Sequence, residues 1–152
     1  MQALNSEYVR PSRLLDLARN SDIVSLHDHH TPVTENMIDD EFFRSMKQGS
    51  FIVNTARGVI IDEKALLRAL ESGRIAGAAL DVLSDEYNSE FRSKLKDSPM
   101  VRYEKNHENL IITPHYGVAT IDAWEKTQKR VIELVIETLN KAGKKWLNGN
   151  VS

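Results

Sequence analysis

Three groups with complementary chemistry each follow an apolar run of strand length. Arg57 ends a small-residue turn after residues 51–54, Asp81 and Glu86 follow the run beginning at Ile75, and His115 follows residues 110–112. In a parallel sheet these positions open on one edge, where ligands bind. Arginine presents a planar fork of donors to a carboxylate, and histidine exchanges a proton near neutral pH. A carboxylate such as Glu86 can orient the ring and favour its protonated form. The pattern predicts a proton-transfer site that grips a carboxylate.

Each of these residues also has an ordinary interpretation. A single arginine after a strand is most often a solvated charge, Glu86 lies in a charge-dense stretch, and His115 could simply cap a loop. Their joint placement at strand ends favours the functional interpretation. The cluster of His27, His29 and His30 has the residue types of a metal site. Two of these histidines are adjacent and no second ligand cluster is visible, so we interpret the cluster as a polar loop and predict no metal.

Composition restricts the class of protein. The 152 residues suit one domain, with 41% hydrophobic and 28% charged residues. The net charge of −2 with both signs interspersed argues against nucleic-acid binding and against an anionic membrane surface. No cysteine is present, which excludes disulfides and thiol chemistry. No signal peptide and no apolar run of the roughly 20 residues that span a membrane is visible, so we expect a cytoplasmic protein without a membrane partner.

Apolar periodicity and breakers predict an alternation of helices and strands. We expect helices over residues 11–20, 39–47, 63–72 and about 120–142, and strands over residues 23–26, 51–54, 75–82 and 110–112. Residues 84–108 are expected to be irregular, with a helical turn near 91–95. This order indicates an α/β fold with a parallel sheet whose faces are covered. No Gly-x-Gly-x-x-Gly and no P-loop occurs in the sequence, so no glycine-rich phosphate turn is predicted.

Five segments together resemble the cofactor-binding domain of the D-isomer-specific 2-hydroxyacid dehydrogenases. They are residues 21–27, 46–58, 61–66, 73–82 and 110–120, in the family's order. The resemblance implies a Rossmann-like parallel sheet that lacks its first βαβ phosphate-binding unit. It also implies a single partial dinucleotide-binding domain over residues 1–152, with the substrate domain absent. The chain is therefore expected to be a C-terminal piece of such an enzyme.

The resemblance assigns a role to each site residue. Arg57 matches the arginine that grips the substrate carboxylate and carbonyl oxygen, His115 the general acid/base, and Glu86 the carboxylate paired with that histidine. Asp81 matches the acid that hydrogen-bonds the nicotinamide carboxamide. The remaining residues expected to line the cofactor, NAD, are His27, Thr55 and Gly117. Tyr87 follows Glu86 where proline is usual, which leaves Asp85 as an alternative for the carboxylate role.

The expected function is hydride transfer between NAD(H) and a 2-hydroxy or 2-keto acid in the intact protein, with this chain inactive alone. The alternative is a non-catalytic dinucleotide-sensing or interaction module like the family's corepressor members. Without the first strand–helix unit, an apolar sheet edge is expected to be exposed. We therefore expect a homo-oligomer, formed through that edge or through the helix at residues 120–142.

Overall fold

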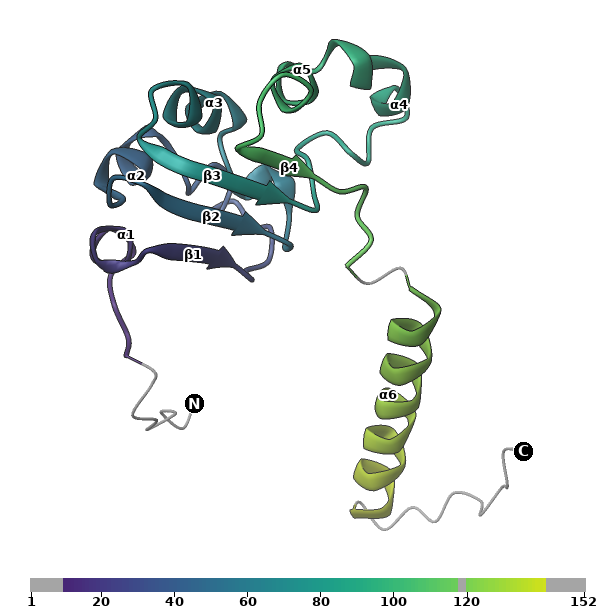
Figure 1. Ribbon diagram of the computed structural model, residues 1–152. Coiled ribbons are helices and arrows are strands. Elements are labelled where there is room, and N and C mark those ends of the chain that lie inside the picture. Colours follow the sequence, from purple (N-terminus) through teal and green to yellow (C-terminus); the bar gives the residue numbers. More distant parts are fainter. Residues whose placement is uncertain (1–9, 118–119, 142–152) are drawn as a thin grey trace. The chain divides into compact units, whose positions relative to one another are not determined.

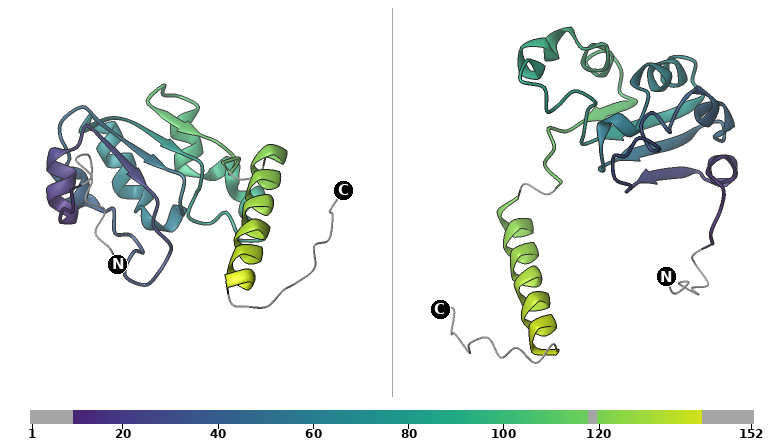
Figure 2. Two further views of the ribbon diagram at one scale, coloured as in Figure 1. Left: turned by 90° about the horizontal axis from the view of Figure 1, so that it is seen from below. Right: turned by 180° about the vertical axis from the view of Figure 1, so that it is seen from behind.

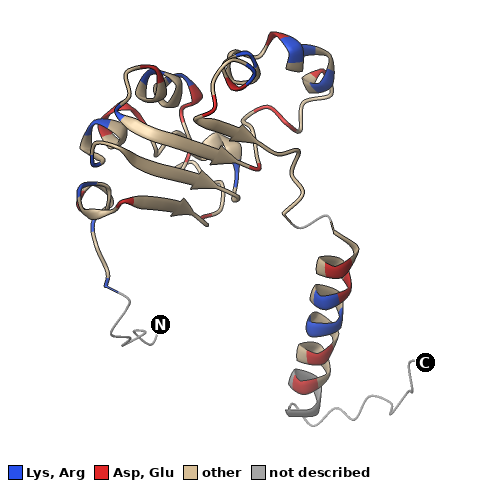
Figure 3. Ribbon diagram, in the orientation of Figure 1, with Lys and Arg blue, Asp and Glu red and all other residues tan. Residues whose placement is uncertain are grey.

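The protein, described by a computed structural model over residues 10–117 and 120–141, contains a four-stranded parallel sheet (Figure 1). The strands are β1 (Ile23–Leu26), β2 (Ser50–Asn54), β3 (Ile75–Leu80) and β4 (Leu110–Ile112), and they pair in that order. None carries a charged side chain (Figure 3), as expected of strands that supply a core. Because all four run parallel, their carboxyl ends lie at one edge of the sheet.

One helix precedes β1, and the other helices and two 3-10 turns connect successive strands. They are α1 (Leu14–Asn20), α2 (Asp40–Ser45), the 3-10 turn η1 (Gly58–Ile60), α3 (Glu63–Glu71), α4 (Phe91–Lys94), the 3-10 turn η2 (Leu95–Asp97) and α5 (Pro99–Glu104). Helix α2 contacts both α1 and α3. Helix α3 contacts β3, and α5 contacts β4 (Figure 2). The core forms between these helices and the sheet around Phe42, Ile52 and Leu66, each of which is fully buried.

Local chemistry explains where these helices begin and end. The carboxylate of Asp62 accepts hydrogen bonds from the N–H groups of Lys64 and Ala65, at 2.9 and 3.3 Å, and so caps the start of α3. Asp39 caps α2 in the same way through Phe42 N–H at 2.9 Å. Gly73 follows α3 with φ +66°, a conformation that glycine adopts without strain. Side-chain caps therefore determine where α2 and α3 begin, and Gly73 determines where α3 ends.

The expected α/β class and parallel sheet are confirmed, and β1 and β4 have the predicted bounds. The strand predicted over residues 75–82 ends earlier, at Leu80, so that Asp81 lies beyond it. Two larger expectations were wrong. Residues 84–108 contain a further helix, α5, which buries Met100 and Tyr103. The expectation that both sheet faces are covered fails within the unit that contains the sheet: Ile23 is 63% exposed, Phe51 47% and Ile111 59%. Ile23 pairs in register with Phe51, so these side chains lie on one open, apolar face.

The chain divides into two compact units between Pro114 and His115. The second unit contains the long helix α6 (Ile121–Lys141), which matches the expected helix at residues 120–142. This helix is amphipathic, and its apolar residues Trp124, Val131 and Val135 are all more than half exposed. Among the described helices, none has the length and hydrophobicity to cross a bilayer.

Candidate active site

The polar residues predicted from the sequence lie where the strands end. Thr55 and Arg57 follow β2, Asp81 follows β3, and His27 follows β1. Strand pairing sets Leu26 beside Asn54 and Asn54 beside Leu80, so the three strand ends are level with one another. The sheet therefore brings His27, Thr55, Arg57 and Asp81 to a single edge, as the parallel arrangement predicted.

A fully buried asparagine builds the turn that carries Arg57. Asn54 has no exposed surface, and its Oδ1 accepts the N–H of Ala56 at 3.0 Å. Its Nδ2 donates to the carbonyl oxygen of Arg57 at 2.9 Å. Both ends of the amide are thus used on the backbone of the turn, which fixes the turn independently of any ligand. The Arg57 side chain is exposed and donates through Nη1 to the carbonyl oxygen of Ala56 at 2.6 Å.

Asp81 is linked to the end of β4. Its carboxylate is largely buried, at 8% exposure, and its Oδ1 accepts the hydroxyl of Thr113 at 2.5 Å. The backbone N–H of Thr113 donates to the carbonyl oxygen of Leu80 at 2.9 Å, and that of Asp81 donates to the carbonyl oxygen of Asn54. The ends of β2, β3 and β4 are therefore connected by hydrogen bonds that pass through Asp81 and its neighbours.

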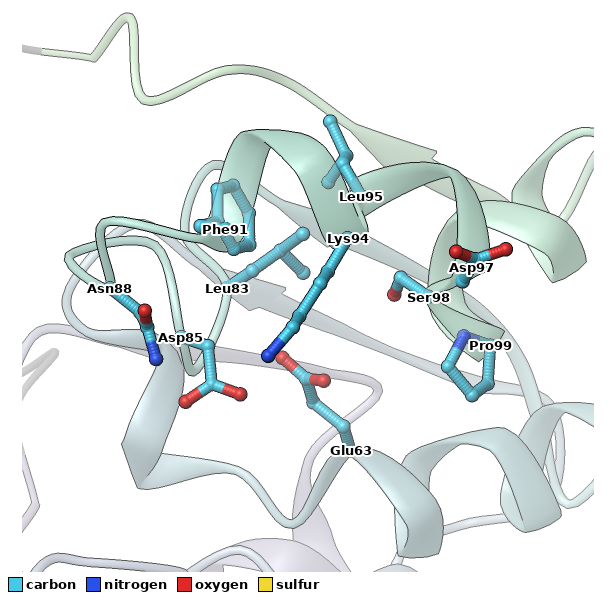
Figure 4. Close-up of a pocket in the computed structure, with 10 residues that line it drawn as sticks. All are labelled: Glu63, Leu83, Asp85, Asn88, Phe91, Lys94, Leu95, Asp97, Ser98 and Pro99. Atoms are coloured by element: carbon cyan, nitrogen blue, oxygen red, sulfur yellow. The ribbon is translucent and has the colours of Figure 1, made fainter.

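The loop after β3 carries Glu86, which is half-buried, whereas the neighbouring Asp85 is exposed. The N–H of Glu86 donates to the carbonyl oxygen of Leu83 at 3.4 Å, so the loop turns back on itself at this point. On the side of this loop that faces α3 and α4 lies a cavity of about 380 Å³ with Leu83, Phe91 and Leu95 among its apolar lining (Figure 4). Asp85 is among the residues that line this cavity.

The two remaining site residues, His115 and Gly117, belong to the second compact unit. His115 is half-buried and has φ +57°, a left-handed conformation that is uncommon for a residue with a side chain. Unusual backbone conformations of this kind cluster at functional sites. The residue directly before Pro114 is Thr113, whose hydroxyl and N–H are held by the end of β3. The chain is therefore held at Thr113, where it leaves the sheet.

The histidine cluster has local partners. His27 Nε2 lies 2.8 Å from the hydroxyl of Ser25, and the carboxylate of Asp28 accepts the N–H of His29 at 2.7 Å. His30 lies 3.5 Å from the carboxylate of Glu35. Within residues 10–117 and 120–141, no three histidine or acidic side chains are gathered as metal ligands would be.

Two residues that fix the geometry of this edge were not identified from the sequence. Asn54 was treated as the last residue of a strand, and Thr113 as a neighbour of Pro114 and His115. One signal could have identified Asn54, namely an amide residue at the end of an otherwise apolar run, immediately before a turn. Such a side chain is buried only when backbone groups satisfy its polar atoms. Thr113 offered no comparable signal, because its partner Asp81 lies 32 residues away.

Comparison with known proteins gives this edge its context. Residues 2–117 match the model of the D-isomer specific 2-hydroxyacid dehydrogenase NAD binding domain. The chain belongs to this family. Its resemblance to the family is thus confirmed, and so is the expected cofactor, since the matched region is an NAD-binding domain.

Individual relatives agree with this family. The chain is 43% identical over 119 residues to the chloroplastic D-3-phosphoglycerate dehydrogenase 2 of Arabidopsis thaliana, covering 78% of this chain and 18% of that protein. It is 40% identical over 121 residues to an aromatic 2-oxoacid reductase of Clostridium sporogenes, covering 77% of this chain and 36% of the relative.

A solved structure supports the fold directly. The D-lactate dehydrogenase of Aquifex aeolicus, in complex with NAD and lactic acid, superposes with a TM-score of 0.65 at 31% identity. The match covers 88% of this chain and 41% of that structure. The chain thus spans less than half the length of each of these three relatives.

Proposed function

We propose that this chain supplies the catalytic side of an NAD-dependent D-2-hydroxyacid dehydrogenase, which exchanges hydride with a 2-hydroxy or 2-keto acid. The observation that carries the proposal is the turn at residues 54–57. Asn54 fixes this turn from within the core and leaves an exposed arginine at the carboxyl edge of a parallel sheet. A guanidinium in that position can donate two parallel hydrogen bonds to a planar carboxylate.

The chemistry of the edge fits the nicotinamide half of the cofactor. Asp81 is a buried carboxylate oriented by Thr113, which suits it to accept the hydrogen bond of a carboxamide. Thr55 and His27 add exposed polar groups at the neighbouring strand ends, and Gly117 completes the set proposed to line the cofactor. When bound, NAD supplies the hydride acceptor or donor of the reaction.

The residues of the chain would act on the substrate and the proton. Arg57 binds the carboxylate and polarises the adjacent carbonyl oxygen through its positive charge. His115 donates a proton to that oxygen during reduction and removes it from the hydroxyl during oxidation. Glu86 is proposed as the carboxylate that acts together with this histidine, the role that the family resemblance implies for it. The exchange of one proton at the oxygen accompanies the transfer of one hydride at the carbon, so both atoms and charge balance.

Ligand binding tests this proposal without requiring turnover. We expect oxamate, an isostere of a 2-keto acid, to shift the guanidinium NMR signals of Arg57 when it is titrated into the chain. Arg57→Gln should abolish binding and Arg57→Lys should weaken it, because an ammonium lacks the planar fork. Arg19→Gln, an exposed arginine on α1, is the matched control and should leave binding unchanged. Oxamate binding that survives Arg57→Gln would remove the basis for the proposal.

Turnover is a separate measurement. Because the sequence contains no glycine-rich phosphate turn, we expect no NADH-dependent reduction of pyruvate or phenylpyruvate by the chain alone, followed at 340 nm. Measurable reduction would contradict that expectation. A substantial NADH affinity measured by calorimetry would favour a working dinucleotide site over an interaction module.

We also propose that the chain associates with a second copy of itself through α6. The helix has an apolar stripe that includes Trp124, Val131 and Val135, all exposed. Residues 121–131 carry Asp122 and Glu125 as well as Lys126, Lys129 and Arg130, a net charge of +1. Residues 132–141 carry Glu133, Glu137 and Lys141, a net charge of −1. In an antiparallel pair the half of one helix with a net positive charge lies beside the half of the other with a net negative charge, which favours that orientation.

Sedimentation can separate α6 from the open sheet face. We expect the chain to form a dimer at micromolar concentration, and Val131→Glu with Val135→Glu to convert it to a monomer. Phe51→Glu places the same charge on the open face of the sheet and should leave the dimer intact. A monomeric wild-type chain would exclude association altogether. Dissociation by Phe51→Glu alone would assign the interface to the sheet.

A further inference from the structure

Two residues from the segment that follows Arg57 contact the start of the loop that carries Glu86. Leu83 is largely buried in the core, and Ser84 comes directly after it. The first contact is made by Gly58, the residue after Arg57, and the second by Glu63, the first residue of α3. Neither residue belongs to the site assigned above.

Gly58 touches the backbone of this loop. A Cβ atom at position 58 would lie 2.1 Å from the carbonyl carbon of Leu83 and 2.4 Å from the nitrogen of Ser84. Real Cβ atoms essentially never come within 3.0 Å of another heavy atom, and both atoms here belong to the backbone. Only glycine fits at this position while the loop keeps its course. The backbone that carries Arg57 and the backbone that leads to Glu86 are therefore in direct contact.

Glu63 holds the same point of the loop through its side chain. Its Oε1 accepts the N–H of Ser84 at 2.8 Å, and Figure 4 shows Glu63 among the residues that line the cavity. The helix that presents Glu63 begins at a fixed point, because Asp62 caps its first turn. The N–H of Glu86 in turn donates to the carbonyl oxygen of Leu83, so the backbone position of Glu86 depends on that of Leu83.

We propose that Gly58 and Glu63 form a clamp that positions the Glu86 loop against the turn of Arg57. Glu63 is thus a positioning residue for the catalytic carboxylate, an inference that rests on the proposed function for the role of Glu86. An acid in the first turn of a helix also stabilises the helix dipole, which is the alternative explanation for a glutamate here. The two explanations differ in their response to the neutral isostere glutamine, which keeps an oxygen acceptor for Ser84 and loses the charge.

Amide hydrogen exchange, followed by NMR, tests the clamp on the chain itself. We expect Glu63→Ala to speed exchange of the Ser84 N–H roughly ten- to a hundredfold, because this bond has a charged acceptor. Glu63→Gln should restore most of that protection. Glu71→Ala removes an exposed acid from the last turn of the same helix and should leave Ser84 unchanged. Unchanged exchange in Glu63→Ala, or equal loss in Glu63→Gln, would overturn the clamp.

A spectroscopic measurement links the clamp to Glu86. We expect the side-chain carboxyl ¹³C signal of Glu86 to move in Glu63→Ala and to return towards its wild-type position in Glu63→Gln. Gly58→Ala should move it as well, since the added methyl group displaces the loop. A Glu86 signal that stays constant in all three variants would contradict positioning. If these shifts appear while oxamate fails to bind, the clamp stands and the proposed dehydrogenase function falls.

Discussion

Replacing Asn54 by alanine should reveal how strongly the turn of Arg57 depends on one buried amide. The substitution removes the acceptor of the Ala56 N–H and the donor to the carbonyl oxygen of Arg57. Ala56 is only 9% exposed, so its N–H is left without a partner at a cost of about 1–3 kcal/mol. The carbonyl of the exposed Arg57 can be hydrated instead, which limits that loss to about 0.5–1.5 kcal/mol. Together they predict a decrease of about 1.5–4.5 kcal/mol in the free energy of unfolding.

Urea denaturation provides the assay, and the choice of signal matters. The described tryptophan, Trp124, lies on α6 in the second unit, so its fluorescence is not a direct signal of the sheet in the first unit. Ile52 and Ile60 are both fully buried in the first unit, so their methyl NMR signals report unfolding of its core. The midpoint should fall without a change in slope. Asn106→Ala, in which an exposed asparagine loses a hydrogen bond of 2.7 Å, should change stability by less than about 0.5 kcal/mol.

Asn54→Asp provides a second test of the same reasoning. The aspartate keeps an acceptor for Ala56 N–H, but its ionised form cannot donate to Arg57 and has no exposure to water. Burial raises the pKa of such a carboxyl, so this variant should regain stability relative to wild type as the pH falls. Surface substitutions usually change the free energy of unfolding by less than about 0.5 kcal/mol. If Asn54→Ala changes it by no more than that, the proposed role of the amide is refuted.

Three further predictions concern individual contacts. Thr113→Val should lower the free energy of unfolding by about 1–3 kcal/mol, because the buried Asp81 carboxylate loses a donor, and Thr113→Ser should restore it in urea denaturation. Asp62→Ala should cost about 1 kcal/mol through loss of the α3 cap, measured in the same assay. Arg68 donates to Asp40 across α2 and α3, and this bond lowers the pKa of Asp40. The contribution of this pair is therefore present above the ordinary pKa of 3.8 and is lost as the pH falls below it. Asp40→Asn should flatten the stability profile in that acid range, and an unchanged profile would contradict the assignment.

Much of the fold followed from the sequence, because local signals and tertiary packing agree. The apolar run of β1, the cap at Asp62 and the glycine after α3 each predicted a boundary that the structure has. Helix α5 was missed because its surroundings are highly charged. Its two buried residues, Met100 and Tyr103, are spaced three apart and give too short an apolar pattern to identify a helix.

The candidate site was predictable in residue type and only partly in structure. Parallel strands alone bring Arg57 and Asp81 to one edge, so sequence order was sufficient to group them. The contacts that fix them depend on residues far apart in the chain, such as Thr113 with Asp81 and Glu63 with Ser84. Likewise, an apolar strand residue such as Ile23 does not indicate whether its face of the sheet is covered. The catalytic and cofactor roles of these residues remain predictions that the proposed ligand and exchange measurements address.

The buried amide of Asn54 also has a kinetic consequence. Because the core holds the turn at residues 54–57 in place, no segment at this part of the edge has to become ordered when an anion arrives. Association at Arg57 should therefore proceed in a single step, at a rate set by diffusion and by the attraction between opposite charges. The entropy that a flexible loop would lose on closing is already lost when the protein folds. Stopped-flow mixing with a 2-keto acid analogue should accordingly give one phase whose rate rises linearly with ligand concentration.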